Sequence, residues 1–253
     1  MLFLLPPSET KLDGGSGMSG LDLGSLSFPQ LTPVRSATLS RLQELSVDEA
    51  ASMAALKLGP RLVGEVARNR QVATSPVEPA LARYTGVLYD AVRAAELDEA
   101  AWTWAGRHVL IHSALLGLVS ASDRVPAYRL SHDSRLPGPS LVQTWREPLA
   151  SVLAGVDDVV LDLRSEGYVK LGPAPEGRSA FLRVVSDEGG RRRALNHFNK
   201  RSKGLLVGAL LRSRPDLRSW ADLAAWAEGE GIELELGHGE VVLVSESLAR
   251  AAA

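Results

Sequence analysis

The sequence predicts a single α+β domain with a mixed sheet and surrounding helices. The chain has 253 residues, of which 45% are hydrophobic, so it can bury a substantial core. Strand-like and helix-like segments alternate without a regular βαβ rhythm, which favours α+β over a doubly wound parallel sheet. Because no internal repeat or clear linker divides the chain, we expect one domain over residues 1–253, with a flexible Gly-rich loop at about 12–33.

The first predicted element is a short buried strand over residues 2–5, which runs directly into a polar segment, residues 6–11. A helical leucine spacing follows from Ser36 to residue 45. Ser46, with Glu49 three residues later, predicts the N-terminus of a helix over 47–56. Gly59-Pro60 ends that helix and begins another, so two helices joined by a tight glycine turn are expected.

The remaining segments give a mixture of strands and helices. Short β-branched or apolar runs predict strands at 84–88, 109–111 and 159–163. Helical patterns occupy 98–107, 141–153 with Ser140 as N-cap, 200–212 and 219–227. Two hairpins are expected, at 181–185 with 192–196 and at 232–236 with 240–244.

The composition excludes several classes of function. The net charge of −2, from 28 basic and 30 acidic residues, argues against a protein that coats nucleic acid with a wholly basic surface. The absence of cysteine excludes disulfides, thiolate metal sites and cysteine nucleophiles. The apolar start is too short for a signal peptide and no stretch approaches ~20 uncharged apolar residues, so a cytoplasmic protein without a membrane partner is expected. The five histidines show no tight metal spacing, and no cofactor motif occurs, so neither a metal nor a cofactor is predicted.

Polar side chains that follow the two strongest strands are the first candidates for chemistry. If the loops after residues 5 and 163 meet, a glutamate with a lysine or tyrosine supplies general acid–base capacity, and a tyrosine–arginine pair can hold an anionic or planar ligand. A structural salt-bridge network is the alternative. The catalytic candidates are Ser8, Glu9, Lys11, Tyr128, Arg129, Glu166 and Lys170.

The densest positive region is Asn199-Lys200-Arg201-Ser202-Lys203, which three arginines precede at 191–193. Lysine and arginine at this density suit contacts with phosphates. Asn196, His197 and Asn199 beside them offer hydrogen bonds to a base, a sugar or a phosphate. A solvated charged surface is the alternative.

Several segments together resemble the YaaA peroxide-stress family, in the form typical of high-GC Gram-positive bacteria. The resemblance is colinear over almost the whole chain, although Ser131-His132 stand where the family form has Glu-Met. The similar segments are Leu5-Pro6-Pro7-Ser8-Glu9-Thr10-Lys11, Tyr84-Thr85-Gly86-Val87-Leu88, residues 111–119, residues 123–130, Trp145, residues 161–168 and Asn199-Lys200-Arg201-Ser202-Lys203-Gly204.

The resemblance implies a compact α+β fold, a role in surviving peroxide stress and in limiting free iron, and DNA binding that includes a helix-hairpin-helix element. The Gly59-Pro60 turn is similar to such an element, in which backbone N–H groups face a phosphate, and an ordinary αα-corner is the alternative. We therefore expect duplex or distorted DNA to bind in a basic cleft. The expected nucleic-acid contacts are Gly59, Arg61, Asn199, Lys200, Arg201 and Lys203.

Two other functions remain open on the sequence. One is an enzyme that acts on a nucleobase or another small planar substrate at the 8–11 loop. The other is a protein-interaction module in iron control.

Overall fold

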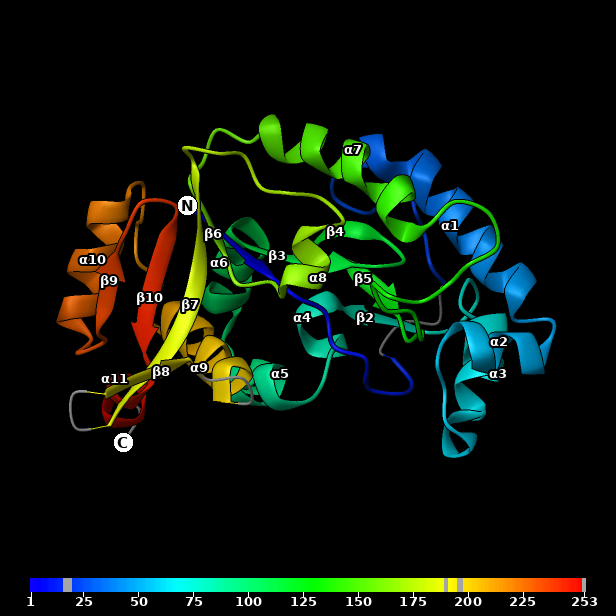
Figure 1. Ribbon diagram of the computed structural model, residues 1–253, viewed down its shortest axis with the longest axis horizontal. Coiled ribbons are helices and arrows are strands. Elements are labelled where there is room, and N and C mark those ends of the chain that lie inside the picture. The colour runs from blue at the N-terminus through cyan, green and yellow to red at the C-terminus, as the bar shows by residue number, and fades with distance from the viewer. Residues whose placement is uncertain (16–19, 189–190, 195–197, 252–253) are drawn as a thin grey trace.

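A mixed β-sheet, with strand order β4-β3-β1-β6-β7-β10-β9 and β8 paired to the end of β7, forms the centre of the fold (Figure 1). The structure is a computed structural model that describes residues 1–15, 20–188, 191–194 and 198–251. The strands of this sheet are β1 (Leu2–Leu5), β3 (Val109–Ser113), β4 (Gly117–Ser120), β6 (Val160–Asp162), β7 (Ser179–Glu188), β8 (Arg191–Ala194), β9 (Leu234–Leu236) and β10 (Glu240–Val244). A separate small ribbon pairs β2 (Val77–Pro79) with β5 (Arg124–Pro126).

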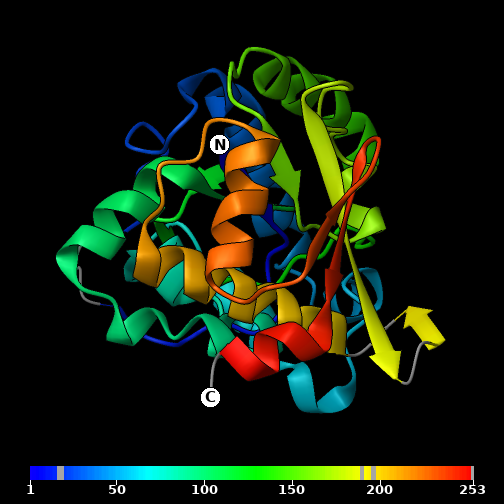
Figure 2. The same cartoon turned by 90° about the vertical axis from the view of Figure 1, so that its left-hand side faces the viewer.

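The helices surround the sheet and complete a single α+β domain, as the sequence predicts. In Figure 1, α1 and α7 lie along the top and α5, α9 and α11 along the bottom, while Figure 2 shows α10 beside the β9–β10 hairpin. The α-helices are α1 (Thr32–Leu45), α2 (Glu49–Ala55), α3 (Gly64–Arg70), α4 (Ala80–Arg83), α5 (Val87–Val92), α6 (Glu99–His108), α7 (Leu141–Ala154), α8 (Glu166–Val169), α9 (Phe198–Ser213), α10 (Trp220–Gly229) and α11 (Ser245–Ala251). Short 3-10 turns occupy Pro29–Leu31, Pro60–Leu62 and Ala94–Glu96.

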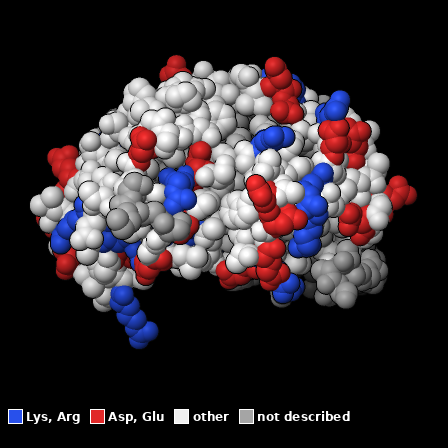
Figure 3. All heavy atoms as spheres, turned by 180° about the vertical axis from the view of Figure 1, so that it is seen from behind, with Lys and Arg blue, Asp and Glu red and all other residues white. Residues whose placement is uncertain are grey.

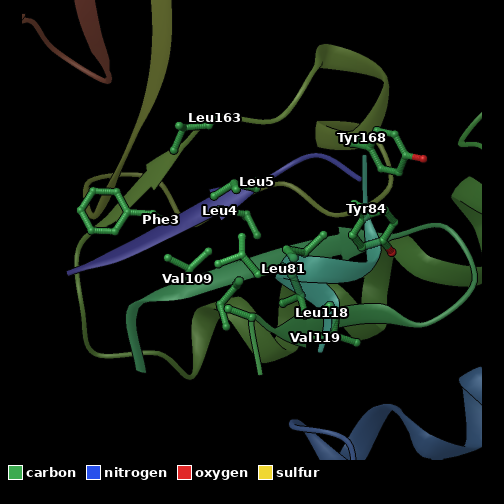
Figure 4. Packing of buried hydrophobic residues seen from close by; sticks show 14 of the residues in the cluster. Phe3, Leu4, Leu5, Leu81, Tyr84, Val109, Leu118, Val119, Leu163 and Tyr168 are labelled. Atoms are coloured by element: carbon green, nitrogen blue, oxygen red, sulfur yellow. The ribbon is translucent and has the colours of Figure 1, made fainter. Parts of the chain in front are cut away.

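β1 lies in the interior of the sheet, parallel to β3 on one side and to β6 on the other. All four of its residues are buried, which explains its uninterrupted apolar sequence, because a parallel strand with both faces covered needs no polar side. Figure 4 shows Leu4 and Leu5 among the side chains of Leu81, Val109 and Leu118, which come from α4, β3 and β4. The strand is thereby fixed in the core up to the residue where its polar loop begins.

Local capping signals begin two of the predicted helices. Ser140 Oγ accepts from the Gln143 backbone N–H at 3.2 Å, and the Gln143 side chain accepts from the Ser140 backbone at 2.9 Å, so α7 begins with a full capping box. Ser219 and Asp222 form the same arrangement at α10. Both predicted helices and the hairpin of β9 and β10 are confirmed. β7 and β8 also form a hairpin, but it pairs residues 185–188 with 191–194, so the strands continue into the segment that the sequence predicted as the turn.

The predicted cap of the second helix is wrong. Asp48 is the N-cap of α2, and its Oδ1 accepts from the Ala51 backbone N–H at 3.0 Å. Ser46 instead donates from its hydroxyl to the carbonyl of Leu42 at 2.6 Å, in the last turn of α1. Its side chain is therefore already engaged by the preceding helix.

The predicted strand at 84–88 is also wrong. Tyr84 forms only an isolated bridge with Lys11, and α5 begins at Val87. Gly86 has a φ of 96°, which turns the backbone out of an extended path directly before the helix. α5 packs against α9, where Gly204 lies next to the backbone of the buried Leu88.

The helix-hairpin-helix element is not confirmed. Gly59 has an extended backbone with a φ of −75°, and Lys57 is the residue with a positive φ, 56°. A 3-10 turn at Pro60–Leu62 separates α2 from α3, which begins only at Gly64. The two helices are therefore not joined by the tight glycine turn that the sequence suggested.

Candidate functional site

A pocket of about 620 Å³ lies beyond the ends of β1 and β6. It is lined by the proline loop, which we define as residues 6–10, and by residues from α5, the 131–133 segment, the chain after β6, β7 and α9. β1 and β6 are parallel neighbours, so their carboxyl ends deliver their polar loops to the same edge of the sheet. Binding sites in open sheets commonly occupy this position.

Short polar contacts hold the proline loop against the start of α5. Thr10 Oγ1 lies 3.2 Å from Ser8 Oγ and donates to the carbonyl of Thr85 at 3.3 Å. A Cβ at Gly86 would lie 3.3 Å from Thr10 Oγ1 and 3.4 Å from Ser8 Oγ. Glycine at 86 therefore allows the loop and the helix to approach this closely, in addition to supplying the positive φ.

Lys11 lies behind the proline loop and is not among the residues that line the pocket. Its Nζ donates to the carbonyl of Ser8 at 2.9 Å and lies 4.1 Å and 5.1 Å from the ring centroids of Tyr128 and Tyr84. Burial, and next the positive charge of Arg129, lowers the pKa of Lys11 to about 7. The amine thus holds the loop backbone towards the core, and its charge changes near neutral pH.

The two tyrosines continue this buried polar chain. The hydroxyl of Tyr128 lies 2.8 Å from that of Tyr84 and 2.6 Å from Ser113 Oγ, which in turn accepts from two backbone N–H groups after β3. Burial raises the pKa of Tyr128 to about 12, so the phenol stays neutral at physiological pH. These hydrogen-bonded hydroxyls therefore support the proline loop on its buried side. Tyr128 supplies no phenolate base to the pocket.

A buried ion pair forms part of the pocket floor. Arg164 donates to the two carboxylate oxygens of Asp162 at 2.6 Å and 2.9 Å, and to Nδ1 of His112 at 2.8 Å. Since Nδ1 accepts this bond, the imidazole is neutral, and burial followed by the charge of Arg164 lowers the pKa of His112 well below its usual value. The guanidinium is thereby fixed on three sides, with the carbonyl of Gly172 as a further acceptor at 2.8 Å.

α9 brings the basic segment to the pocket. Asn199, Lys200 and Lys203 line it, and Lys200 is exposed at the rim. Lys203 is only 4% exposed, and its Nζ donates to the carbonyl of Leu163 at 2.9 Å. Burial lowers the pKa of Lys203 to about 8. One end of the pocket, formed by β7 and α9, is therefore cationic.

The family model for peroxide stress protein YaaA matches residues 1–234. The chain belongs to this family. Among its relatives, a UPF0246 protein of Corynebacterium efficiens is 41% identical over 244 residues, which cover 94% of this chain and 96% of the relative. A UPF0246 protein of Streptomyces coelicolor is 43% identical over 93% of this chain and 92% of its own length. A UPF0246 protein of Methylibium petroleiphilum is 29% identical over 90% of this chain and 93% of its own length. The high-GC Gram-positive form of the YaaA family is confirmed, and the family supports a role in peroxide stress.

The predicted catalytic residues of this YaaA-family chain fall into three groups. Ser8, Glu9 and Glu166 line the pocket. The side chains of Lys11, Tyr128 and Arg129 lie behind the proline loop, where Arg129 forms an ion pair with Glu9. Lys170 is exposed and outside the pocket lining. The two predicted loops therefore line one pocket. Glu166 lines it together with Ser8 and Glu9, whereas Lys11 and Lys170 do not.

The predicted nucleic-acid contacts are divided between distant parts of the molecule. Arg201 is exposed in the first turn of α9, close to the pocket-lining Asn199, Lys200 and Lys203. Gly59 and Arg61 are exposed between α2 and α3, which lie at the right-hand end of the molecule in Figure 1, away from α9. Arg191 to Arg193 form most of β8, and the expected hydrogen-bonding residues Asn196 and His197 lie outside the described residues.

Several polar or aromatic residues of the pocket were not predicted from the sequence, among them two aromatic residues and two arginines. His132 and Tyr168 both line it, with ring centroids 5.0 Å apart and an interplanar angle of 80°. Arg183 lies on β7 and Arg164 on the floor. The departure from the family form at Ser131-His132 was the available signal for one of them, because it placed an aromatic ring next to Tyr128-Arg129.

The described residues contain neither a cluster of metal-ligating side chains nor a helix that could span a membrane. There, no group of three or more His, Cys, Asp or Glu side chains is arranged to hold a metal ion. Across the same residues, no helix has the length and apolar character needed to cross a bilayer.

Proposed function

We propose that this chain acts in the peroxide-stress response by binding DNA where the first turn of α9 meets the pocket. The observation that carries the proposal is the position of α9. Asn199 and Lys200 in its first turn line the pocket, and Lys200 and Arg201 are exposed at the pocket mouth. Cations there suit phosphate contacts, and the N-terminal end of the helix adds a favourable dipole.

The size of the pocket favours distorted DNA over a regular duplex. A volume of about 620 Å³ is that of a small-molecule site, so a base can enter only when it is unpaired and displaced from the stack. Figure 3 shows the face opposite to that of Figure 1, where lysines and arginines are interspersed with acidic residues and form no continuous basic surface over the described residues. This face therefore offers no extended basic surface that would compete with the contact at α9.

Fluorescence anisotropy with labelled DNA tests the proposal. The probes are a duplex, the same duplex with one unpaired nucleotide, and a single strand, each titrated over a salt series. We expect the interrupted duplex to bind more tightly than the regular one. A K200Q/R201Q variant should bind weakly, with a salt slope reduced by roughly 0.9 for each lost phosphate contact.

The matched control is R146Q/R218Q, which neutralises two exposed arginines that do not line the pocket. Its affinity should equal that of the wild type. Unchanged affinity in a folded K200Q/R201Q variant would contradict the proposal. An R61Q variant tests the second predicted contact, and a loss there would extend the DNA path towards the α2–α3 end.

A second candidate function is an enzyme that acts on a nucleobase or another small planar substrate. It is favoured by one observation: Ser8, Glu9 and Glu166 line the same pocket as the rings of His132 and Tyr168. The aromatic rings suit a planar ligand, and the carboxylates supply acid–base groups.

Peroxide survival of a deletion strain separates the two functions. The strain is complemented with wild type, K200Q/R201Q or E166Q. Protection by a variant that no longer binds DNA would favour the enzyme, particularly if E166Q fails to protect while still binding DNA. Loss of protection in K200Q/R201Q alone would favour the DNA-binding role.

A further inference from the structure

Two buried cations beside the pocket share one buried carboxylate. Arg164 is fully buried, and Lys203 and Asp162 are each 4% exposed. Arg164 occupies both oxygens of Asp162. Within the described ranges no ion pair joins Lys203 to a carboxylate, and its hydrogen-bond acceptors are the carbonyls of Leu163 and Arg164, at 2.9 Å and 3.5 Å. With His112 neutral, a protonated Lys203 leaves this cluster with one uncompensated positive charge.

An uncompensated buried charge is costly, so proteins normally pair it or keep it neutral. Burial accordingly lowers the pKa of Lys203 to about 8, although Asp162 acts in the opposite direction. An ammonium has three donors, and two of those of Lys203 point to carbonyls. Lys203 also lines the pocket, so an anionic ligand entering there can supply the missing charge.

A second buried polar atom points to the rest of the ligand. Asn199 lines the pocket four residues before Lys203, on the same face of α9. Its Oδ1 is buried and has no hydrogen-bond partner among the described residues. An amide oxygen can only accept a hydrogen bond, so an O–H or N–H group of a ligand in the pocket fits it. The ligand therefore needs an anion and a donor close together.

We propose that the pocket binds the phosphomonoester of a hydroxyl-bearing sugar, with the phosphate at Lys203 and a sugar hydroxyl at Asn199. This rests on the proposed function, in that it places a nucleic-acid component in the same pocket. The other charged groups that line this end are Lys200 at the rim, Arg183, which pairs with Glu240 at 2.9 Å, and Glu166. The base of a nucleotide then extends towards Tyr168 and His132.

Isothermal titration calorimetry at pH 8 with 2′-deoxyadenosine 5′-monophosphate and with 2′-deoxyadenosine tests the proposal. We expect the monophosphate to bind about tenfold or more tightly than the nucleoside, as charge-assisted hydrogen bonds provide. Titrations in two buffers of different ionisation enthalpy should show uptake of about half a proton. The reason is that Lys203 is about half protonated at this pH and the phosphate raises its pKa.

A K203M variant should lose both the preference for the monophosphate and the proton uptake, whereas R218M, at an exposed arginine, should keep both. If K203M does not fold, the proton uptake of the wild type is still a sufficient test. Equal affinities for nucleoside and monophosphate would overturn the inference and leave a small planar ligand in the pocket intact. Absence of binding by both would also overturn it, and DNA anisotropy then decides the proposed function separately.

The phosphate could belong to a DNA strand end or to a free nucleotide. Short single-stranded DNAs with and without a 5′-phosphate distinguish these two sources. Tighter binding of the phosphorylated strand supports a strand end as the ligand. Equal binding of the two strands, together with tight binding of the monophosphate, supports a free nucleotide.

Discussion

Replacing Lys11 by methionine should make the free energy of unfolding less dependent on pH above neutrality. In the folded protein the pKa of Lys11 is about 7, because burial and Arg129 disfavour the charged amine more than Glu65 and Glu9 favour it. In the unfolded chain the pKa returns to about 10.5. Between these values the folded state is neutral while the unfolded state holds a proton, so folding releases a proton and stability rises with pH.

The magnitude follows from the shift. Each pH unit between about 7 and 10.5 adds up to about 1.4 kcal/mol to the free energy of unfolding, and below pH 7 the contribution is constant. From pH 6.5 to pH 9, the wild type should therefore gain on the order of 2 kcal/mol relative to K11M. Lys203 is present in both proteins, so its own titration cancels in the difference.

Urea denaturation at pH 6.5, 7.5, 8.5 and 9 measures this difference. Methionine keeps an unbranched apolar side chain, one atom shorter than lysine, beside the rings of Tyr84 and Tyr128. K170M, at an exposed lysine, is the matched control and should follow the pH dependence of the wild type. If the free energies of unfolding of the wild type and K11M change equally with pH, Lys11 is not held as a largely neutral amine above pH 7 and the reasoning is refuted.

Three further substitutions should destabilise the protein, as measured by chemical denaturation. G204A puts a Cβ into a backbone carbonyl of α5 and should cost about 1–3 kcal/mol, whereas G229A, with nothing within 4 Å, should be tolerated. R164M leaves a buried carboxylate without its partner and should cost about 3–5 kcal/mol. R218M breaks an exposed pair and should leave the denaturation midpoint unchanged. S113A removes the acceptor of two buried N–H groups and should cost about 1–3 kcal/mol, and a value near zero would show that water replaces it.

Elements whose determinants are local were predictable. β1 follows from a run of apolar residues that the parallel sheet buries on both faces, and α7 and α10 follow from capping residues within three positions of their start. The errors occurred where a distant segment decided the structure. At 84–88, the approach of Gly86 to Ser8 and Thr10 and the packing of α5 on α9 replaced the strand that the residues favoured.

The sequence by itself determined that a polar loop would follow a buried strand and that Glu166 would follow another, because the strands' apolar sequences require burial and end at these residues. Only the tertiary structure decided that the two loops form one pocket, that Lys11 supports this pocket from behind, and that the segment between α2 and α3 lies away from α9. It also decided that Asp162, Arg164, His112 and Lys203 share a buried cluster. These residues come from β6 and the segment after it, β3 and α9, and their charges interact only because the sheet and its helices exclude water between them.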